Sequence, residues 1–211
     1  CIAYPPLTTV LAVPSLKEDT LYISSGTWSL LGVEQKEPIC TEESRQANFT
    51  NEGGYAYRYR YLKNIMGLWM IQSVRRELPE HYSFSELCDL ARESQAFPSR
   101  VDVNADVFLA PESMINAIQL ECARTMQPVP QTPGELAEVI YQSLAESYAK
   151  AIKELERLTG IPYDEIHIVG GGSNAEYLNE LTAEKSGLRV LAGPAEATAI
   201  GNLEAQMIAA G

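Results

Sequence analysis

The sequence contains few of the residues that metal sites, disulfide scaffolds and membrane segments require. Its 211 residues include only four cysteines and two histidines. The cysteines lie far apart without CxxC spacing, so they indicate reduced thiols and a cytoplasmic location rather than zinc or disulfides. No apolar run approaches the roughly 20 residues of a membrane helix, and no secretory signal is visible. We therefore expect neither a zinc site nor membrane association.

Basic residues are also scarce. The chain has 16 Lys and Arg against 28 Asp and Glu, which gives a formal net charge of −12. Affinity for the nucleic-acid backbone depends on clustered basic side chains, so we expect no nucleic-acid partner. The one tight basic group, residues 58–63, alternates with aromatic residues as a half-buried strand does. The length suits a single domain with one well-buried core.

The hydrophobic pattern switches between the period of a strand and the period of a helix. Strands are expected at residues 21–24, 28–33, 55–62, 165–169 and 188–191. Residues 48–54 are polar and glycine-rich, and we expect a loop there. Helices are expected at 65–78, from the capping box 83–86 through Ala91, and at 111–125, 133–159, 174–185 and about 195–209. Alternation of strand and helix near the C-terminus predicts a parallel α/β layer.

A triple glycine, Gly170-Gly171-Gly172, stands between a predicted strand and a predicted helix. Glycine has no Cβ to block a phosphate, and a helix N-terminus offers free N–H groups with a favourable dipole. The run matches neither GxGxxG nor a Walker loop. A tight structural turn is an equally good interpretation. In a chain this acidic, a bound anion would need backbone N–H groups and a metal ion.

Other polar candidates lie near the N-terminus. The small residues 24–27 form a predicted turn between strands that could expose N–H and hydroxyl groups to phosphate, although a plain hairpin turn is the commoner case. Asn64 and Gln72 are eight residues apart, which places both on one face of the predicted helix. Two solvated amides are the commoner interpretation of such a pair. Trp28 and Trp69 are expected to anchor the core.

Three segments in a fixed order, residues 24–32, 51–54 and 63–69, resemble the C-terminal half of the rhamnulokinases, sugar kinases of the FGGY family. Residues 168–174 and 192–202 extend the resemblance, which runs from about Val10 to the C-terminus. It implies an α/β fold: an actin-like (ribonuclease H-like) ATPase domain that is the C-terminal half of a two-domain kinase. The implied ATP-binding domain comprises residues 10–211, after an atypical segment 1–9.

The resemblance also implies a reaction and the residues that take part in it. Thr27, Gln72 and Gly171 match family positions that contact ATP, and Asn64 matches a position facing the sugar. The family transfers the γ-phosphoryl group of ATP to L-rhamnulose, giving L-rhamnulose 1-phosphate. An aspartate acts as base and Mg²⁺ neutralises the phosphates, so catalysis depends on positioning and electrostatics.

Position 5 departs from the family pattern. Where the catalytic aspartate is expected the chain has Pro5, which cannot accept a proton. The resemblance therefore implies no catalytic residue here, no activity of the chain alone, and sugar binding only with an N-terminal domain. A chain that starts at Cys1 without that domain is expected to be a fragment that exposes apolar surface and self-associates. The alternative is a non-catalytic nucleotide-binding or interaction module derived from an FGGY kinase.

Overall fold

The computed structural model describes residues 20–54, 57–197, 199–200, 203 and 206–207, so segment 1–9 and Pro5 lie outside the described residues. Six strands form one mixed sheet in the order β3-β4-β2-β1-β5-β6. The strands are β1 (Tyr22–Ser25), β2 (Trp28–Gln35), β3 (Phe49–Gly53), β4 (Tyr59–Met66), β5 (Glu165–Val169) and β6 (Arg189–Ala192). Strands β5 and β6 are parallel, as expected, and β1 also pairs parallel with β5. Strand β2 pairs antiparallel with β1 and β4, and β3 pairs antiparallel with β4.

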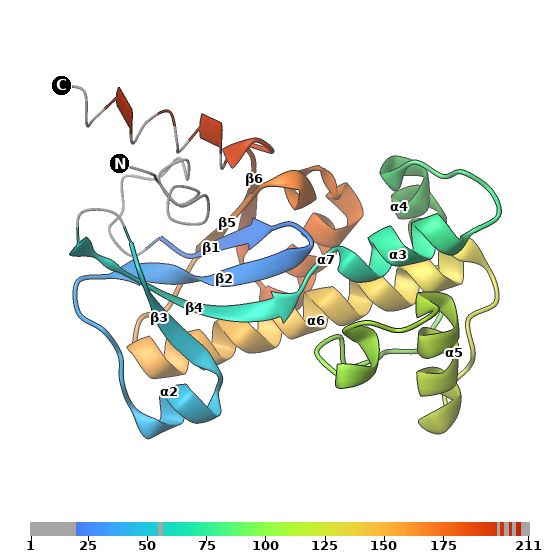
Figure 1. Cartoon of the computed structure of the whole chain (residues 1–211), viewed down its shortest axis with the longest axis horizontal. Helices are drawn as coiled ribbons and strands as arrows, with labels where there is room; N and C mark the ends of the chain where they lie inside the picture. The colour runs from blue at the N-terminus through green and yellow to red at the C-terminus, as the bar shows by residue number, and fades with distance from the viewer. Residues whose placement is uncertain (1–19, 55–56, 198, 201–202, 204–205, 208–211) are drawn as a thin grey trace.

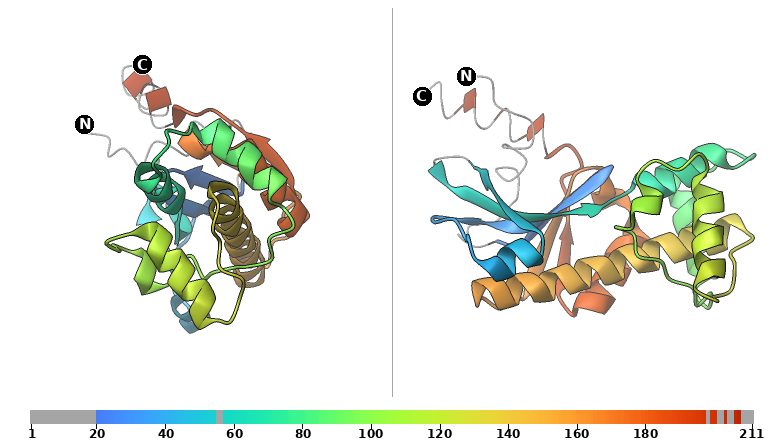
Figure 2. Two further views of the ribbon diagram at one scale, coloured as in Figure 1. Left: turned by 90° about the vertical axis from the view of Figure 1, so that its right-hand side faces the viewer. Right: turned by 60° about the horizontal axis from the view of Figure 1, so that its bottom comes forward.

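Between Glu42 and Ser186, the described residues form six α-helices. They are α2 (Glu42–Gln46), α3 (Trp69–Glu77), α4 (Phe84–Glu93), α5 (Met114–Arg124), α6 (Pro133–Thr159) and α7 (Glu176–Ser186). Two 3-10 turns, η2 (Asp106–Phe108) and η3 (Gly171–Asn174), complete the list. The C-terminal part of the long helix α6 runs beneath the sheet. Helices α3, α4 and α5 lie around its N-terminal end (Figure 1, Figure 2).

Helix α6 forms where its sequence signals predict it. Thr132 and Glu135 make a reciprocal capping box, Pro133 occupies the first turn, and Gly160 ends the helix with φ at 71°. Apolar residues at helical spacing, among them Ile140 and Leu144, are completely buried. They pack against the sheet and form the main core of the molecule. This helix is therefore the scaffold on which the sheet rests.

The segment 48–54 is a strand, not the expected loop. It forms β3 at the edge of the sheet, paired with β4 from Phe49 opposite Lys63 to Gly53 opposite Tyr59. Phe49 is buried and its ring stacks on Tyr61, with 5.1 Å between ring centroids. This distant aromatic contact, which local composition does not reveal, outweighs the polar character of the segment.

The helix expected from residue 65 begins later, at Trp69. Strand β4 continues through Met66 because it pairs with β2 over its whole length, ending with Met66 opposite Trp28. Asn64 therefore lies on a strand while Gln72 lies on α3, so the prediction that both share one helix face is wrong. The ends of the other predicted helices agree with the structure within a few residues.

Trp28 is not a core anchor. It is 44% exposed, whereas the next residue, Ser29, is completely buried and its hydroxyl lies 2.6 Å from the Tyr148 hydroxyl. Since successive side chains of a strand point to opposite faces, the buried Ser29 turns Trp28 outward. Trp69 is half-buried against the core, and its indole N–H donates to the Phe108 carbonyl at 3.3 Å.

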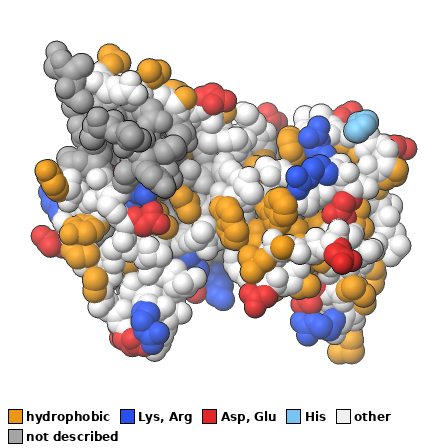
Figure 3. Space-filling view, in the orientation of Figure 1, with side chains coloured by type: hydrophobic (Ala, Val, Ile, Leu, Met, Phe, Trp, Pro, Cys, Tyr) orange, Lys and Arg blue, Asp and Glu red, His pale blue; other side chains and the backbone are white. Residues whose placement is uncertain are grey.

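Apolar side chains also reach the surface away from the sheet. Figure 3 shows them gathered over the α3–α5 end of the molecule, and the exposed ones there include Val107, Leu109 and Leu120. Among the described residues, no helix has both the length and the apolar character needed to cross a membrane. The last expected helix falls partly outside the described residues; its described part within 197–207 is helical.

Candidate functional site

Two turns of small residues lie next to each other at one end of the sheet, where strands β1 and β5 terminate. The first joins β1 to β2, and the second, residues 170–174, follows β5. Strands β1 and β5 are parallel neighbours with Ser24 opposite Val169, so both turns leave the same end of the sheet. Gly170 has φ at 85°, and a Cβ there would lie 2.8 Å from the Ser25 carbonyl oxygen. The second turn therefore needs glycine at its first position.

The other two glycines of this turn differ from each other. A Cβ on Gly172 would lie 1.9 Å from the Ser25 hydroxyl oxygen and 2.5 Å from the Ser25 Cβ. Around Gly171, by contrast, no described atom outside Gly171 and its two chain neighbours lies within 4 Å of the position of a Cβ, and its φ is not in the left-handed region. The packing thus explains Gly170 and Gly172 but not Gly171. A glycine with a free side is what close approach of a ligand to the backbone requires.

Gly172→Ala should destabilise the protein by about 1–3 kcal/mol, because the new methyl group overlaps the buried Ser25. The double variant with Ser25→Gly removes both contacting side-chain atoms and should recover most of that loss. Urea unfolding of the parent, the two single variants and the double variant measures the coupling between the sites. Additive effects of the two substitutions would contradict this contact.

A hollow of about 400 Å³ opens between the two turns. Its described lining includes Ser25, Gly26, Trp28, Asn64, Gly170 and Gly171. We refer to it as the smaller hollow; its volume is within the range of small-molecule sites. Glu196 is the one ionisable group in that described lining. A ligand here would therefore meet backbone, hydroxyl and amide groups, an exposed indole and one carboxyl group.

Thr27 and Gln72 are brought together beside this hollow. The N–H groups of Leu68 and Trp69 donate to the carbonyls of Gly26 and Thr27 at 2.8 and 3.1 Å. Helix α3 has no side-chain cap among the described residues, so these carbonyls satisfy its first N–H groups instead. The Thr27 hydroxyl then donates to Gln72 Oε1 at 3.4 Å. The first turn and the helix are thus fixed relative to each other.

Asn64 and Trp28 form a wall between the smaller hollow and a larger one. The larger hollow, about 810 Å³, is lined by both residues and by polar side chains of β4, α6 and the 101–109 segment. Lys63 in this lining is paired with Glu154 at 2.6 Å. Asn64 is exposed at the end of β4, so its amide is accessible to a ligand. The candidates Asn64 and Gly171 consequently line one hollow, with Thr27 and Gln72 next to it.

Sequence reasoning missed the role of two residues at this site. Trp28, expected in the core, forms the wall, and Ser25 is the residue against which two of the glycines pack. The available signal was the position of both next to a turn of small residues.

Burial raises the pKa of Tyr148 to about 12. The Tyr148 hydroxyl therefore keeps its proton beside Ser29 and continues to hold the start of β2 in place.

Comparisons with known proteins identify the family. The sequence model of one protein family, the C-terminal domain of the FGGY family of carbohydrate kinases, matches residues 21–210. Rhamnulokinase from Oceanobacillus iheyensis is 51% identical over 200 residues, which cover 95% of this chain and 42% of that protein. Rhamnulokinase from Bacillus subtilis is 50% identical over 201 residues, covering 95% of this chain and 41% of that protein. The chain thus spans less than half the length of these curated relatives.

Solved structures show the same fold at low sequence identity. Xylulose kinase from Rhodospirillum rubrum has a TM-score of 0.66 at 14% identity, covering 98% of this chain and 41% of that one. Plasmodium falciparum glycerol kinase, solved with ADP, has a TM-score of 0.62 at 10% identity, covering 96% of this chain and 42% of that one. The expected actin-like α/β fold is confirmed. The chain belongs to the FGGY family of carbohydrate kinases and corresponds to their C-terminal domain.

Proposed function

We propose that this chain is the nucleotide-binding part of an ATP-dependent sugar kinase that converts L-rhamnulose to L-rhamnulose 1-phosphate. The observation that carries the nucleotide site is Gly171, whose open side lies at a hollow between two turns and has no packing role among the described residues. The choice of sugar is supported by the roughly half-identical rhamnulokinases. We also propose a cytoplasmic location.

The proposed contacts follow from the geometry of the site. The backbone at Gly171 approaches the nucleotide closely, because no Cβ intervenes. Thr27 and Gln72, already joined to each other, contact the phosphates from the first turn. Asn64 faces the sugar from the wall between the two hollows. Each of these groups binds and orients, and none of them transfers a proton.

Mg²⁺ is the metal that we propose for this reaction, where it would neutralise charge on the phosphates. Among the described residues, no three His, Cys, Asp or Glu side chains are grouped as metal ligands. The described residues therefore do not fit a resident metal site. We propose that the ion arrives bound to the nucleotide, so that the chain recognises the metal–nucleotide complex through uncharged groups.

Two parts of the catalytic machinery are missing from the chain. An N-terminal domain would supply most sugar contacts, whereas the base is expected within this chain, at the position that Pro5 occupies. We propose that the chain alone is inactive and, with its exposed apolar side chains, self-associates. The same proline favours the second candidate, a nucleotide-binding or interaction module derived from a kinase that has lost catalysis.

Calorimetric titration of the chain with ADP and Mg²⁺ tests the proposed site. The parent should bind, whereas Gly171→Val should bind about tenfold more weakly or worse, because its side chain fills the space beside the backbone. Gly53→Val is the matched control: no described atom lies within 4 Å of its Cβ position either, and it lies on the edge strand β3.

Two results would contradict the assignment. A folded Gly171→Val variant that binds ADP as tightly as the parent would remove Gly171 from the site. Absence of binding by the parent at millimolar nucleotide would contradict a nucleotide site in the chain as a whole. Equal loss in the Gly53→Val control would point to a general effect of valine on the fold.

A further inference from the structure

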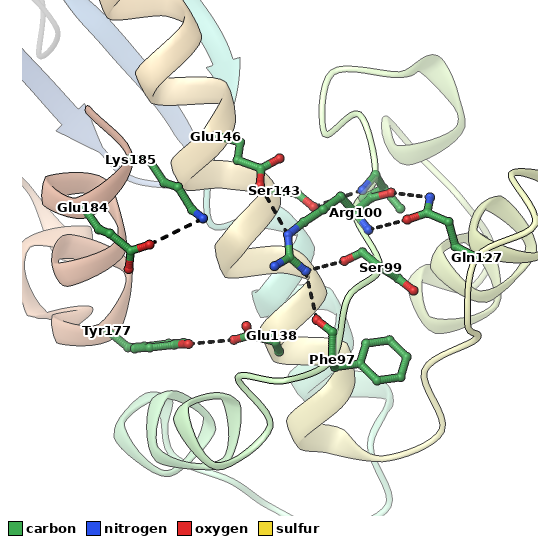
Figure 4. Close-up of polar contacts among 11 residues, drawn as sticks. Phe97, Ser99, Arg100, Gln127, Glu138, Ser143, Glu146, Tyr177, Glu184 and Lys185 are labelled. Carbon is green, nitrogen blue, oxygen red and sulfur yellow. Dashed lines mark hydrogen bonds and ion pairs between the residues drawn. The ribbon is translucent and has the colours of Figure 1, made fainter. Parts of the chain in front are cut away.

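A buried carboxylate near the N-terminal end of α6 has no part in the proposed contacts. Glu138 is completely buried, and its Oε2 accepts a hydrogen bond of 2.9 Å from the Tyr177 hydroxyl (Figure 4). Its other oxygen, Oε1, has no hydrogen-bond partner among the described residues. Burying a carboxylate is costly, so a group retained at this depth calls for a specific role.

Titratable and charged groups surround this carboxylate from several elements. Burial raises the pKa of Glu138, and the Tyr177 hydroxyl, the Gln142 amide, Arg100 and Lys185 act in the opposite direction. Arg100 donates to the carbonyls of Phe97 and Ser99 and pairs with Glu146, and Lys185 pairs with Glu184. The two cations therefore have nearer partners, and Tyr177 makes the direct contact with Glu138.

Tyr177 joins three helices at its position in the first turn of α7. Its ring meets Tyr141 of α6 edge to face, with centroids 6.2 Å apart. The Arg92 guanidinium of α4 lies 5.1 Å from the Tyr177 centroid and also binds Glu180 of α7 at 2.9 Å. The first turns of α7 are thereby fixed to both α4 and α6, and the hydroxyl bond to Glu138 sets the depth of the ring.

The start of α7 also holds the glycine turn, residues 170–174, in place. Helix α7 starts at Glu176, directly after the segment 170–175, and no side chain caps its N-terminus among the described residues. Asn179, on the next turn of the helix, donates from Nδ2 to the Ser173 carbonyl at 2.9 Å. A shift of the first turn of α7 would therefore move Ser173 and, with it, the neighbouring Gly171.

We propose that Glu138 and Tyr177 are positioning residues that hold the glycine turn in its ligand-binding geometry from behind. The inference rests on the proposed function for the ligand, which is a nucleoside diphosphate with its metal ion. Neither residue lines the described part of the smaller hollow, so both act through α7 and the Asn179 contact. The effect is on the placement of backbone, not on charge at the ligand.

Three substitutions separate positioning from general stability. Tyr177→Phe deletes the hydroxyl and keeps the ring contacts. Glu138→Gln removes the charge but keeps an oxygen that accepts the Tyr177 hydrogen bond. Thr182→Val is the matched control, because Thr182 is completely buried on the same helix and its hydroxyl donates to the Leu178 carbonyl at 2.7 Å, away from the turn.

Two readouts are measured well below the melting temperature: the affinity for ADP with Mg²⁺, and amide hydrogen exchange of Ser173 and Ala175. These amides donate to Gly170 and Gly172 within the turn. Tyr177→Phe should weaken ADP binding about 2- to 30-fold and speed exchange of both amides. Glu138→Gln should stay close to the parent in both readouts. Thr182→Val should lower the melting temperature and change neither.

Each result decides between the possibilities. Unchanged exchange of the two amides in Tyr177→Phe would overturn the inference, as would an equal effect in Thr182→Val. Glu138→Gln behaving like Tyr177→Phe would overturn the role of Glu138 as acceptor. If the parent binds no ADP but Tyr177→Phe still speeds exchange, the nucleotide proposal fails while the positioning of the turn stands.

Discussion

The isolated chain should release no ADP above background when supplied with ATP, Mg²⁺ and L-rhamnulose. The residues proposed at the site bind and orient, and position 5, where the base is expected, is proline. General-base assistance alone is worth about 10²- to 10⁴-fold. Loss of the domain that orients the acceptor costs more, because well-oriented reactants reach effective concentrations of about 10⁵–10⁸ M. A coupled assay for ADP release measures the rate.

Activity should return only when the domain and the base are both restored. Pro5→Asp in the isolated chain should leave it inactive. Fusion of a rhamnulokinase N-terminal domain, together with Tyr4→His, Pro5→Asp and Pro6→Thr, should give turnover. The matched control is the same fusion with Pro5 retained, which should be slower by about 10²- to 10⁴-fold. Robust turnover by the unmodified chain would contradict the interpretation of Pro5 as a lost catalytic position.

The elements that the sequence predicted well carry all their signals locally. Helix α6 has a capping box at Thr132, a proline in its first turn, a stop at Gly160 and a continuous apolar face between them. Strand β5 was predicted with its observed bounds because its apolar run is followed by a glycine turn. Such signals lie within a few residues of the structure they specify, so they can be recognised without tertiary contacts.

The features that were missed depend on partners far away in the chain. β3 is held by the stacking of Phe49 on Tyr61, twelve residues along the chain, and β4 is extended by pairing with β2. Trp28 faces outward because Ser29 takes the inward position with Tyr148, 119 residues away. Local propensity yields to tertiary contacts at each of these positions.

The candidate site was predictable in part. The glycine run predicted a turn after β5, which the structure has, and the position of Gly171 within it matches the family contact proposed for ATP. Which of the three glycines is free of packing depends on where Ser25 lies, and that information exists only in the folded molecule. The contact of Thr27 with Gln72 likewise requires α3 to start at Trp69, three residues beyond the end of β4.

The wall between the two hollows depends on the close pairing of β2 with β4. At Gly32 the two strands leave no room for a Cβ. A Cβ on Gly32 would lie 2.3 Å from the Tyr61 carbonyl oxygen and 2.7 Å from the Leu62 Cα. These are backbone atoms of a paired strand, so no side-chain rotation can relieve the overlap. The same pairing places Leu30 opposite Asn64 and therefore aligns the site.

Gly32→Ala should accordingly lower the free energy of unfolding by about 3 kcal/mol, the upper end of the usual cost of overpacking. Gly53→Ala is the matched control on strand β3, where no described atom lies within 4 Å of the Cβ position. Because alanine restricts the unfolded chain more than glycine, the control should be neutral or stabilised by up to about 1 kcal/mol. Urea unfolding of the three proteins measures the difference. A Gly32→Ala variant as stable as the control would mean that β2 and β4 are not this close, and the wall formed by Trp28 and Asn64 would lose its structural basis.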